Sequence, residues 1–230
     1  YERTKLASLA SHAFREQRDF RSLMAARGNA PWTTLIQKSI QSQPNLWFVI
    51  GLGLAFLPAA LVGFFAHKSI KDYLFSPTTV AISLIVGGII ILVVERMRNR
   101  VRVKELLQVT PRLALWVGIA QCASLIPGMS RSGSTIVGGL LAGLDRRVAT
   151  EYSFFLALPT MIIATIYQML KSQAAFSQDD YVALGIGLVV SFAVAWAVIA
   201  AFLTYVQRHS LSVFAYYRMV LGVIVLLVVR

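Results

Sequence analysis

The nine residues from Pro127 to Thr135 interrupt a strongly apolar region with an arginine, several hydroxyl groups and two glycines. A charged side chain on irregular backbone at membrane depth is tolerated only where protein or a water-filled cavity surrounds it. Glycine lets backbone approach a ligand closely, and the start of a helix offers free N–H groups to an anion. This segment, called the motif loop below, therefore predicts a phosphate-binding loop inside a membrane protein.

The composition agrees with a membrane location. The chain of 230 residues is 57% hydrophobic and only 14% charged, with a mean hydropathy of +0.68, whereas soluble domains are nearer half apolar and a quarter charged. A net charge of +12 could indicate nucleic acid, but the basic residues lie beside apolar segments, as membrane anchors do. We therefore expect a polytopic membrane protein that binds no nucleic acid. Its single cysteine, Cys122, excludes an internal disulfide.

Apolar runs predict an all-α fold with about five spanning helices. The candidate spans are residues 46–66, 79–94, 152–170, 182–206 and 214–229, with a polar link over 67–77. Residues 1–46 form a separate segment with seven basic and three acidic residues, which is typical of a cytoplasmic loop. Residues 47–230 are predicted to form the membrane domain.

The segments on either side of the motif loop are too short to cross a membrane singly. Residues 113–126 and 133–144 each fall short of the ~20 residues that a spanning helix needs. The flanking segments 95–112 and 145–147 both carry net positive charge, which favours the same, cytoplasmic side for both. The sequence therefore predicts a re-entrant helical hairpin over residues 113–144, with the motif loop at its tip.

Arg131 is the candidate ligand-binding residue of the motif loop. Its planar guanidinium matches phosphate oxygens and stays charged under all relevant conditions. The alternative is a structural ion pair, for which Glu151 is the candidate partner. Glu151 could also bind a polar ligand, or it could be an ordinary interface residue.

The hydroxyl groups of the loop allow two interpretations. Such groups serve as helix caps or packing contacts in membrane helices, or they contact the ligand. We expect Ser132 to cap the following helix and Ser130 and Thr135 to face the ligand. The backbone N–H groups of residues 133–135 are expected to stabilise negative charge. The remaining candidate binding residues are Gly128, Gly133, Ser134 and Gln121.

Gln121 precedes the loop, so it lines the same cavity or makes structural hydrogen bonds. The chain contains no Gly-Lys-Ser/Thr phosphate loop, which argues against nucleotide hydrolysis. The three histidines show no metal-site spacing, so the metal ligands stay unknown.

The run Pro-Gly-Met-Ser-Arg-Ser-Gly at residues 127–133 resembles the Pro-Gly-x-Ser-Arg-Ser-Gly motif of bacterial undecaprenyl-diphosphate phosphatases, also called bacitracin-resistance proteins. The likeness extends to Gln121-Cys122 and to Glu-Tyr-Ser-Phe-Phe-Leu-Ala-Leu-Pro at 151–159. Leu57-Pro58-Ala59 and Ile70-Lys71 also fit, so the resemblance covers roughly residues 47–230.

This resemblance implies hydrolysis of undecaprenyl diphosphate to the monophosphate, the carrier lipid of peptidoglycan synthesis, in the bacterial inner membrane. It implies an inverted repeat of two halves, each with a re-entrant hairpin, whose shared site lies near the midplane. It assigns phosphate binding to Arg131, with Ser130 and Ser132 beside it as catalytic groups. It also implies a divalent cation, magnesium or calcium.

One departure from the family pattern leaves alternatives open. The family's Glu-rich motif and its Ser-Ser-Thr-Gly-His loop do not occur in these 230 residues, and we expect that the sequence lacks about the first quarter of the family pattern. A transporter or binder of polyprenyl phosphate that does not hydrolyse it is therefore the main alternative, and a non-enzymatic membrane protein is a third. The oligomeric state stays open, a homodimer included.

Overall fold

The computed structural model describes residues 2–25, 31–97, 101–171 and 178–229, and every regular element within these ranges is a helix. The α-helices are α1 Glu2–Ala25, α2 Trp32–Ser42, α3 Pro44–Leu74, α4 Pro77–Arg96, α5 Pro111–Gln121, α6 Arg131–Leu141, α7 Arg146–Lys171, α8 Gln178–Arg208 and α9 Ser212–Val228. Two short 3₁₀ helices, Leu106–Gln108 and Cys122–Leu125, flank α5. The predicted all-α class is confirmed.

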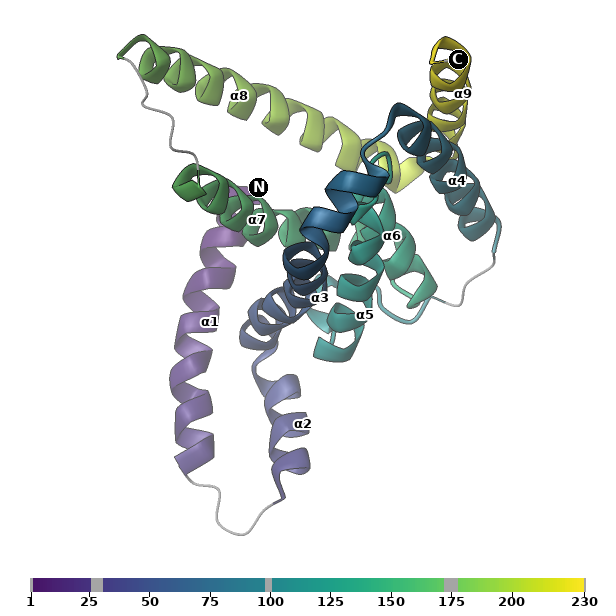
Figure 1. Cartoon of the computed structure of the whole chain (residues 1–230). Coiled ribbons are helices and arrows are strands. Elements are labelled where there is room, and N and C mark those ends of the chain that lie inside the picture. Colours follow the sequence, from purple (N-terminus) through teal and green to yellow (C-terminus); the bar gives the residue numbers. More distant parts are fainter. Residues whose placement is uncertain (1, 26–30, 98–100, 172–177, 230) are drawn as a thin grey trace.

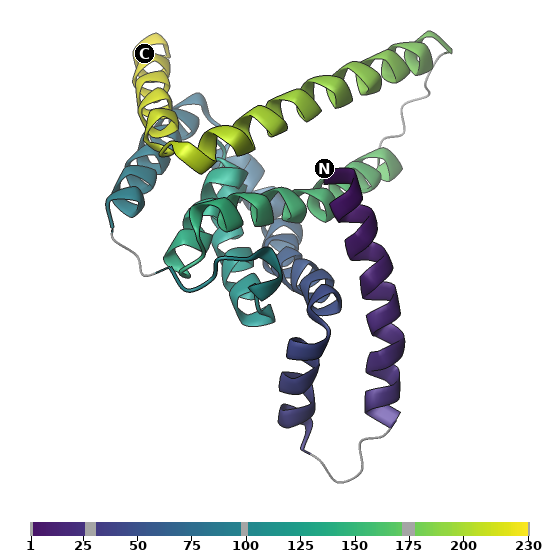
Figure 2. The same ribbon diagram turned by 180° about the vertical axis from the view of Figure 1, so that it is seen from behind.

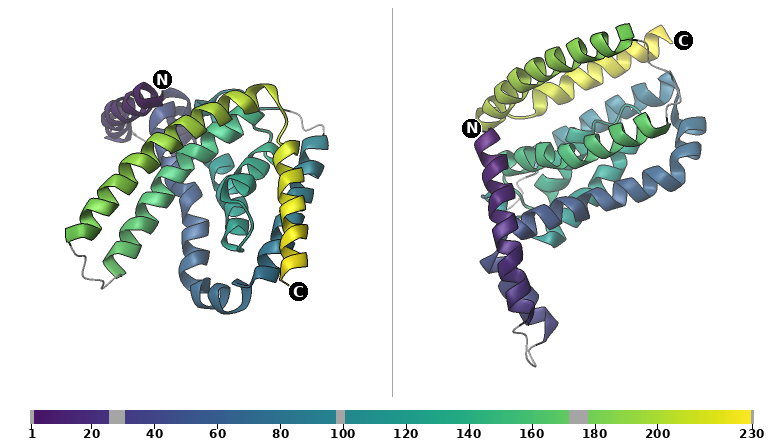
Figure 3. Two further views of the ribbon diagram at one scale, coloured as in Figure 1. Left: turned by 90° about the horizontal axis from the view of Figure 1, so that it is seen from above. Right: turned by 90° about the vertical axis from the view of Figure 1, so that its left-hand side faces the viewer.

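Four helices in the described ranges are long and apolar enough to cross a membrane. Their spans are Pro44–Ala66, Pro77–Arg96, Arg146–Lys171 and Tyr181–Arg208. The fifth predicted span corresponds to α9, which is apolar but has only 17 residues. In the right-hand view of Figure 3 the axes of these helices slope the same way, although the chain follows them in alternating directions, and α1 lies across them.

Capping residues explain where several helices begin. Ser76 accepts a hydrogen bond from the Thr79 N–H at 3.1 Å and precedes Pro77, and Thr110 stands in the same relation to Pro111. A hydroxyl at the N-cap with proline at the first helical position is a favoured helix start. Helix α3 continues to Leu74, so the predicted polar link over 67–77 is helical over most of its length, and the candidate span within α3 ends at Ala66, where that link begins.

Small residues let α3 and α5 pack closely along a shared direction. A Cβ atom at Gly51 would lie 3.2 Å from Ala114 Cβ, and one at Gly118 would lie 2.7 Å from Ala55 Cα. Glycine and alanine at such contacts allow membrane helices to approach backbone to backbone. One turn before Gly51 on α3, the Phe48 ring meets the rings of Tyr152 and Phe155 of α7 edge to face.

Helices α4 and α9 form a second close pair, antiparallel to each other, at the right of Figure 1 and at the left of Figure 2. A Cβ at Gly88 of α4 would lie 2.8 Å from the Ala215 carbonyl oxygen, and one at Gly222 would lie 2.8 Å from that of Ala81. This register brings the middle of α9 against the middle of α4.

Helices α5 and α6 form a helical hairpin with the motif loop at its tip. The Trp116 indole N–H donates to the Gly138 carbonyl at 3.2 Å across the hairpin. The flanking segments meet at the open end, where Arg102 N–H donates to the Gly143 carbonyl and Asp145 N–H to that of Val103, both at 2.8 Å. The two segments that flank the hairpin, which the charge pattern predicts to be on the same side, therefore lie next to each other.

Much of the molecule's surface is apolar. The window of α8 that qualifies as a span has no buried residues, and its Leu188 and Trp196 side chains are about 70% exposed. Figure 1 shows α8 reaching away from the other helices. An apolar surface of this extent is unusual for a soluble monomer and is suited to contact with lipid.

Replacing Gly118 with alanine tests the α3–α5 contact. The new methyl group would meet the backbone of Ala55, which cannot move aside as a flexible side chain could. We expect Gly118→Ala to lower the free energy of unfolding by about 1–3 kcal/mol, measured by thermal melting in detergent. Gly185→Ala is the control, because nothing lies within 4 Å of that Cβ position; equal melting of both variants would contradict the account.

Candidate functional site

Ser130 is the N-cap of α6, and its hydrogen bonds stabilise the first turn of the helix. Its hydroxyl accepts a hydrogen bond from the Gly133 N–H at 3.1 Å, and its carbonyl accepts one from the Ser134 N–H at 2.9 Å. The prediction that Ser132 is the cap is therefore wrong by two residues. Ser132 Oγ instead lies 3.1 Å from Ser130 Oγ. Because Ser130 uses the N–H groups of residues 133 and 134, the free donors of this turn are those of residues 131 and 132.

Thr135 faces the helix packing and not a ligand. It has no exposed surface, and its hydroxyl lies 2.6 Å from Ser153 Oγ of α7 and 3.0 Å from the Arg131 carbonyl. This agrees with the packing alternative and contradicts the predicted ligand contact. The side chain ties α6 to α7 next to Arg131.

Arg131 is the first residue of α6 and is partly buried. Its Nη1 donates to the carbonyl of Ser153 at 3.4 Å, and no other described residue takes one of its N–H groups. The alternative, an ion pair of Arg131 with Glu151, does not form in this structure. Glu151 accepts instead from Arg147 Nε at 2.9 Å, one helical turn away on α7. Arg131 therefore keeps donors available beside the N-terminus of α6.

Gln121 is fully buried at the end of α5, but it does not line the pocket described below. Neither its Oε1 nor its Nε2 has a hydrogen-bond partner among the described residues. Neither of its two predicted roles is therefore seen in this structure.

The tip of the motif loop rests on α4. Gly128 has φ of +89°, a conformation that glycine adopts without the steric cost of a side chain. A Cβ at this position would lie 2.5 Å from the Val80 carbonyl oxygen. Glycine is thus required here both for the backbone conformation and for the close approach to α4.

A second guanidinium, that of Arg218 in α9, also reaches the loop. Its Nη2 donates to the Gly128 carbonyl at 3.0 Å, and the residue is only 9% exposed. Sequence reasoning missed this residue. Arg218 is the only charged residue between Phe214 and Val229, and a charge within an apolar segment of that length is itself a signal of function.

A pocket of about 180 Å³ lies between α4, α5, α6 and α9, next to the motif loop. Gly133, Ser134 and Arg218 line it together with apolar side chains that include Ile90 and Trp116. The surface of the pocket is almost wholly apolar, which is suited to the hydrocarbon chain of an amphiphilic ligand.

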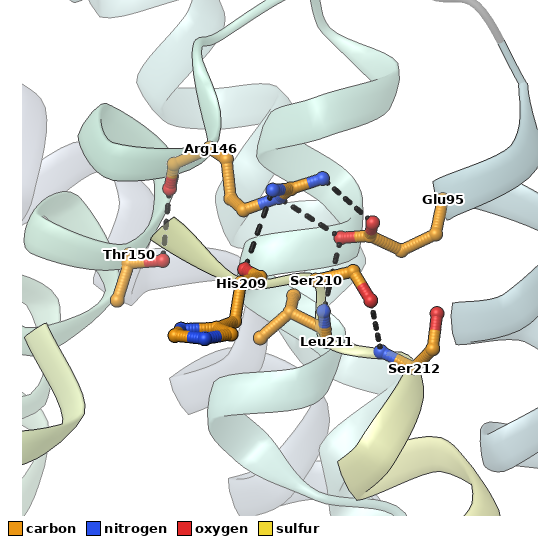
Figure 4. Close-up of polar contacts among 7 residues, drawn as sticks. All are labelled: Glu95, Arg146, Thr150, His209, Ser210, Leu211 and Ser212. Atoms are coloured by element: carbon orange, nitrogen blue, oxygen red, sulfur yellow. Dashed lines mark hydrogen bonds and ion pairs between the residues drawn. The ribbon is translucent and has the colours of Figure 1, made fainter. Parts of the chain in front are cut away.

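The open end of the hairpin carries a separate polar cluster (Figure 4). Arg146 of α7 binds both carboxylate oxygens of Glu95, at 2.7 and 3.1 Å, and donates to the His209 carbonyl at 3.3 Å. Glu95 also accepts from the Leu211 N–H at 3.5 Å. The cluster joins the end of α4, the start of α7 and the turn between α8 and α9, and we interpret it as structural.

The described residues do not suit the divalent cation that the family resemblance implies. No three of their histidine, cysteine, aspartate or glutamate side chains gather into a possible metal site. The motif loop itself presents a guanidinium and hydroxyl groups, whereas magnesium and calcium prefer carboxylate and carbonyl oxygens. No step of the chemistry below is therefore assigned to a metal.

Comparison with known proteins shows the family to which this chain belongs. The chain matches the family model described as bacitracin resistance protein BacA over residues 5–224. It is 49% identical over 186 residues to an undecaprenyl-diphosphatase of Thermoanaerobacter pseudethanolicus. The aligned region covers 80% of this chain and 68% of that protein. It is 46% identical over 194 residues to undecaprenyl-diphosphatase 2 of Rhodospirillum rubrum, covering 84% and 71% respectively. The chain is therefore a multi-pass membrane protein and belongs to the family of the bacitracin resistance protein BacA.

Proposed function

We propose that this protein hydrolyses undecaprenyl diphosphate to undecaprenyl phosphate and inorganic phosphate, and that the motif loop binds the phosphate that is released. The observation that carries the proposal is Arg131, a partly buried guanidinium with unused donors at the N-terminus of α6. Relatives named undecaprenyl-diphosphatase, at 46% and 49% identity, support the same reaction.

The loop is built to stabilise negative charge as phosphorus is attacked. When water attacks the terminal phosphorus, the bridging P–O bond breaks, and lipid monophosphate leaves with the bridging oxygen. Charge on the transferred group's equatorial oxygens is then stabilised by fixed donors. Arg131 supplies a planar pair of donors, and the N–H groups of residues 131 and 132 point out of the first helical turn.

The apolar pocket reaches the first turn of α6 at Gly133 and Ser134, whereas Arg131 and Ser132 lie outside its lining. Ile90 and Trp116 line the pocket, and we assign them to the first units of the prenyl chain. Gly133 and Ser134 line the same pocket from the first turn of α6, where the diphosphate would lie. A long apolar chain held in this way brings its charged head to the helix N-terminus without exposing that chain to water.

The membrane arrangement is part of the proposal. We place the hairpin of residues 113–144 as re-entrant in the bacterial inner membrane, with residues 95–112 and 145–147 on the cytoplasmic side. The meeting of its two flanks near Val103 and Leu144 supports this placement. The base that takes a proton from the attacking water, and the ligands of a divalent cation, are proposed to come from the family's first-half motifs, which these 230 residues do not contain. A homodimer is compatible with the exposed apolar surface of α8.

Substitution of Arg131 tests the function directly. Loss of a preorganised donor to the transition state lowers kcat by about 10²–10³-fold, so Arg131→Ala should abolish most phosphate release in the whole native protein. Arg131→Lys should recover only part, since lysine keeps the charge but not the planar pair of donors. The measurement is inorganic phosphate released from labelled undecaprenyl diphosphate in detergent micelles.

Arg112→Ala is the matched control, because Arg112 is an exposed arginine at the start of α5. It should behave as the wild type. Phosphate release by Arg131→Ala within about threefold of wild type would contradict the proposal. Movement of uncleaved lipid across liposomes without phosphate release would instead support the transporter alternative.

Gly128→Ala tests the contact between the tip of the motif loop and α4. An alanine would be strained at φ +89° and would collide with the Val80 carbonyl, at a cost of about 1–3 kcal/mol for the backbone strain alone. We expect lower phosphate release per folded molecule together with a lower melting temperature. Gly187→Ala, whose Cβ position is open, should change neither, and an unimpaired Gly128→Ala would show that the loop does not need this contact.

A further inference from the structure

Arg218 is a buried charge, and no carboxylate among the described residues pairs with it. Nine-tenths of its surface is covered, and its recorded hydrogen bonds go to two carbonyls, that of Gly128 at 3.0 Å and that of Ser83 at 3.5 Å. Its Nε has no partner among the described residues. An uncompensated charge among apolar helices is costly, so its position calls for an explanation beyond packing.

The helices are shaped to admit this guanidinium. Gly87 follows Ser83 by one turn of α4, and a Cβ at Gly87 would lie 3.0 Å from Arg218 Cζ and 2.9 Å from Met129 Sδ of the motif loop. Only the missing side chain at Gly87 leaves room for the guanidinium between α4 and the loop. The close contact of α9 with α4 at Gly88 then sets how far the guanidinium of Arg218 reaches between α4 and the loop.

The same guanidinium lies over the first turn of α6. Arg218 Nη1 is 3.2 Å from the position that a Cβ at Gly133 would occupy. The hydrogen bond of Arg218 to the Gly128 carbonyl therefore holds the turn before Ser130 and Arg131. The positive charge of Arg218 lies beside the N-terminus of α6, which begins at Arg131. A positive charge at that point makes the electrostatic potential more positive, which favours the binding of an anion.

We propose that Arg218 is a positioning residue for the phosphate site, which holds the Gly128 turn so that Arg131 and the first turn of α6 meet the phosphoryl group. It acts through the motif loop and does not itself bind the reacting atoms. The inference rests on the proposed function, since it assigns a role within that same site. It also explains why a guanidinium is bound by carbonyls at this depth.

Two variants at position 218 separate positioning from simple stability. Arg218→Met keeps length and apolar bulk but removes the hydrogen bond and the charge. We expect kcat to fall by about 10²-fold, with KM for the lipid changed by less than about threefold, because the prenyl contacts stay in place. Arg218→Lys should restore part of kcat, since an ammonium can still donate to Gly128. Met219→Leu is the control, because Met219 lies against Gly88 of α4 and is not part of the pocket lining.

Gly87→Ala tests the same inference with every charge retained. The added methyl group meets the far end of the flexible Arg218 side chain, so the fold can accept it by moving the guanidinium off the Gly128 carbonyl. We expect kcat to fall by about tenfold or more while the melting temperature stays near that of wild type. Gly53→Ala on α3 is the control, with nothing within 4 Å of its Cβ position.

Each outcome decides the matter. Wild-type kcat in Arg218→Met or in Gly87→Ala would overturn the inference, and so would a KM raised tenfold with kcat unchanged, which would make Arg218 a ground-state ligand contact. If Arg218→Met does not fold, Gly87→Ala still decides. Loss of phosphate release in Arg131→Ala but not in the variants at 218 and 87 rejects this inference alone, whereas a wild type without phosphate release rejects the proposed function as well.

Discussion

A positive charge held between apolar helices must be compensated, and in the described part of this protein the compensation comes from backbone carbonyls. Arg131 donates to Ser153 and Arg218 to Gly128, each without a carboxylate at the guanidinium. A carbonyl dipole offsets a full charge only partly, so both residues keep a net attraction for an anion. In the function proposed above, the anionic head of the lipid substrate supplies the compensation that the helices lack.

Close helix packing is what places the two cations around one loop. Gly118 on α5 contacts the backbone of Ala55, and Gly88 on α4 contacts that of Ala215, so two helix pairs approach at their smallest residues. The hairpin and α9 are thereby brought to the same region of α4. At the other end, the ion pair of Glu95 with Arg146 fixes the flanks of these elements to one another. The loop is thus presented by a scaffold that is anchored at both ends.

Much of this arrangement could be predicted from the residues alone. Apolar length separated spanning helices from the shorter α5 and α6, and charge placed the two flanks of the hairpin together. Arg131 could be identified as a candidate because an arginine in apolar surroundings is costly and therefore indicates a functional site. Four of the five predicted spans correspond to candidate spanning helices in the described ranges, because α9, with 17 residues, lies just below the length that a spanning helix needs.

Side-chain direction within the loop could not be predicted. Hydroxyl residues at 130, 132, 134 and 135 surround the first turn of α6 on all sides, so no apolar pattern shows which one faces the helix N-terminus. Ser130 is the cap and Thr135 faces Ser153, because tertiary packing sets the rotation of the helix. Arg218 lies 87 residues beyond Arg131, and only the pairing of α9 with α4 brings it to the loop.

Binding of a lipid that cannot be cleaved tests the central claim most directly. A polyprenyl methylene-diphosphonate retains the charge of the substrate but has no bridging oxygen to release, so its affinity reports head-group binding apart from chemistry. Measured by calorimetry in nanodiscs, it should bind at least about tenfold more weakly to Arg131→Gln than to wild type, which corresponds to ~1.4 kcal/mol. Equal affinities for the two proteins would contradict the account, because the head group would then not be held by this loop.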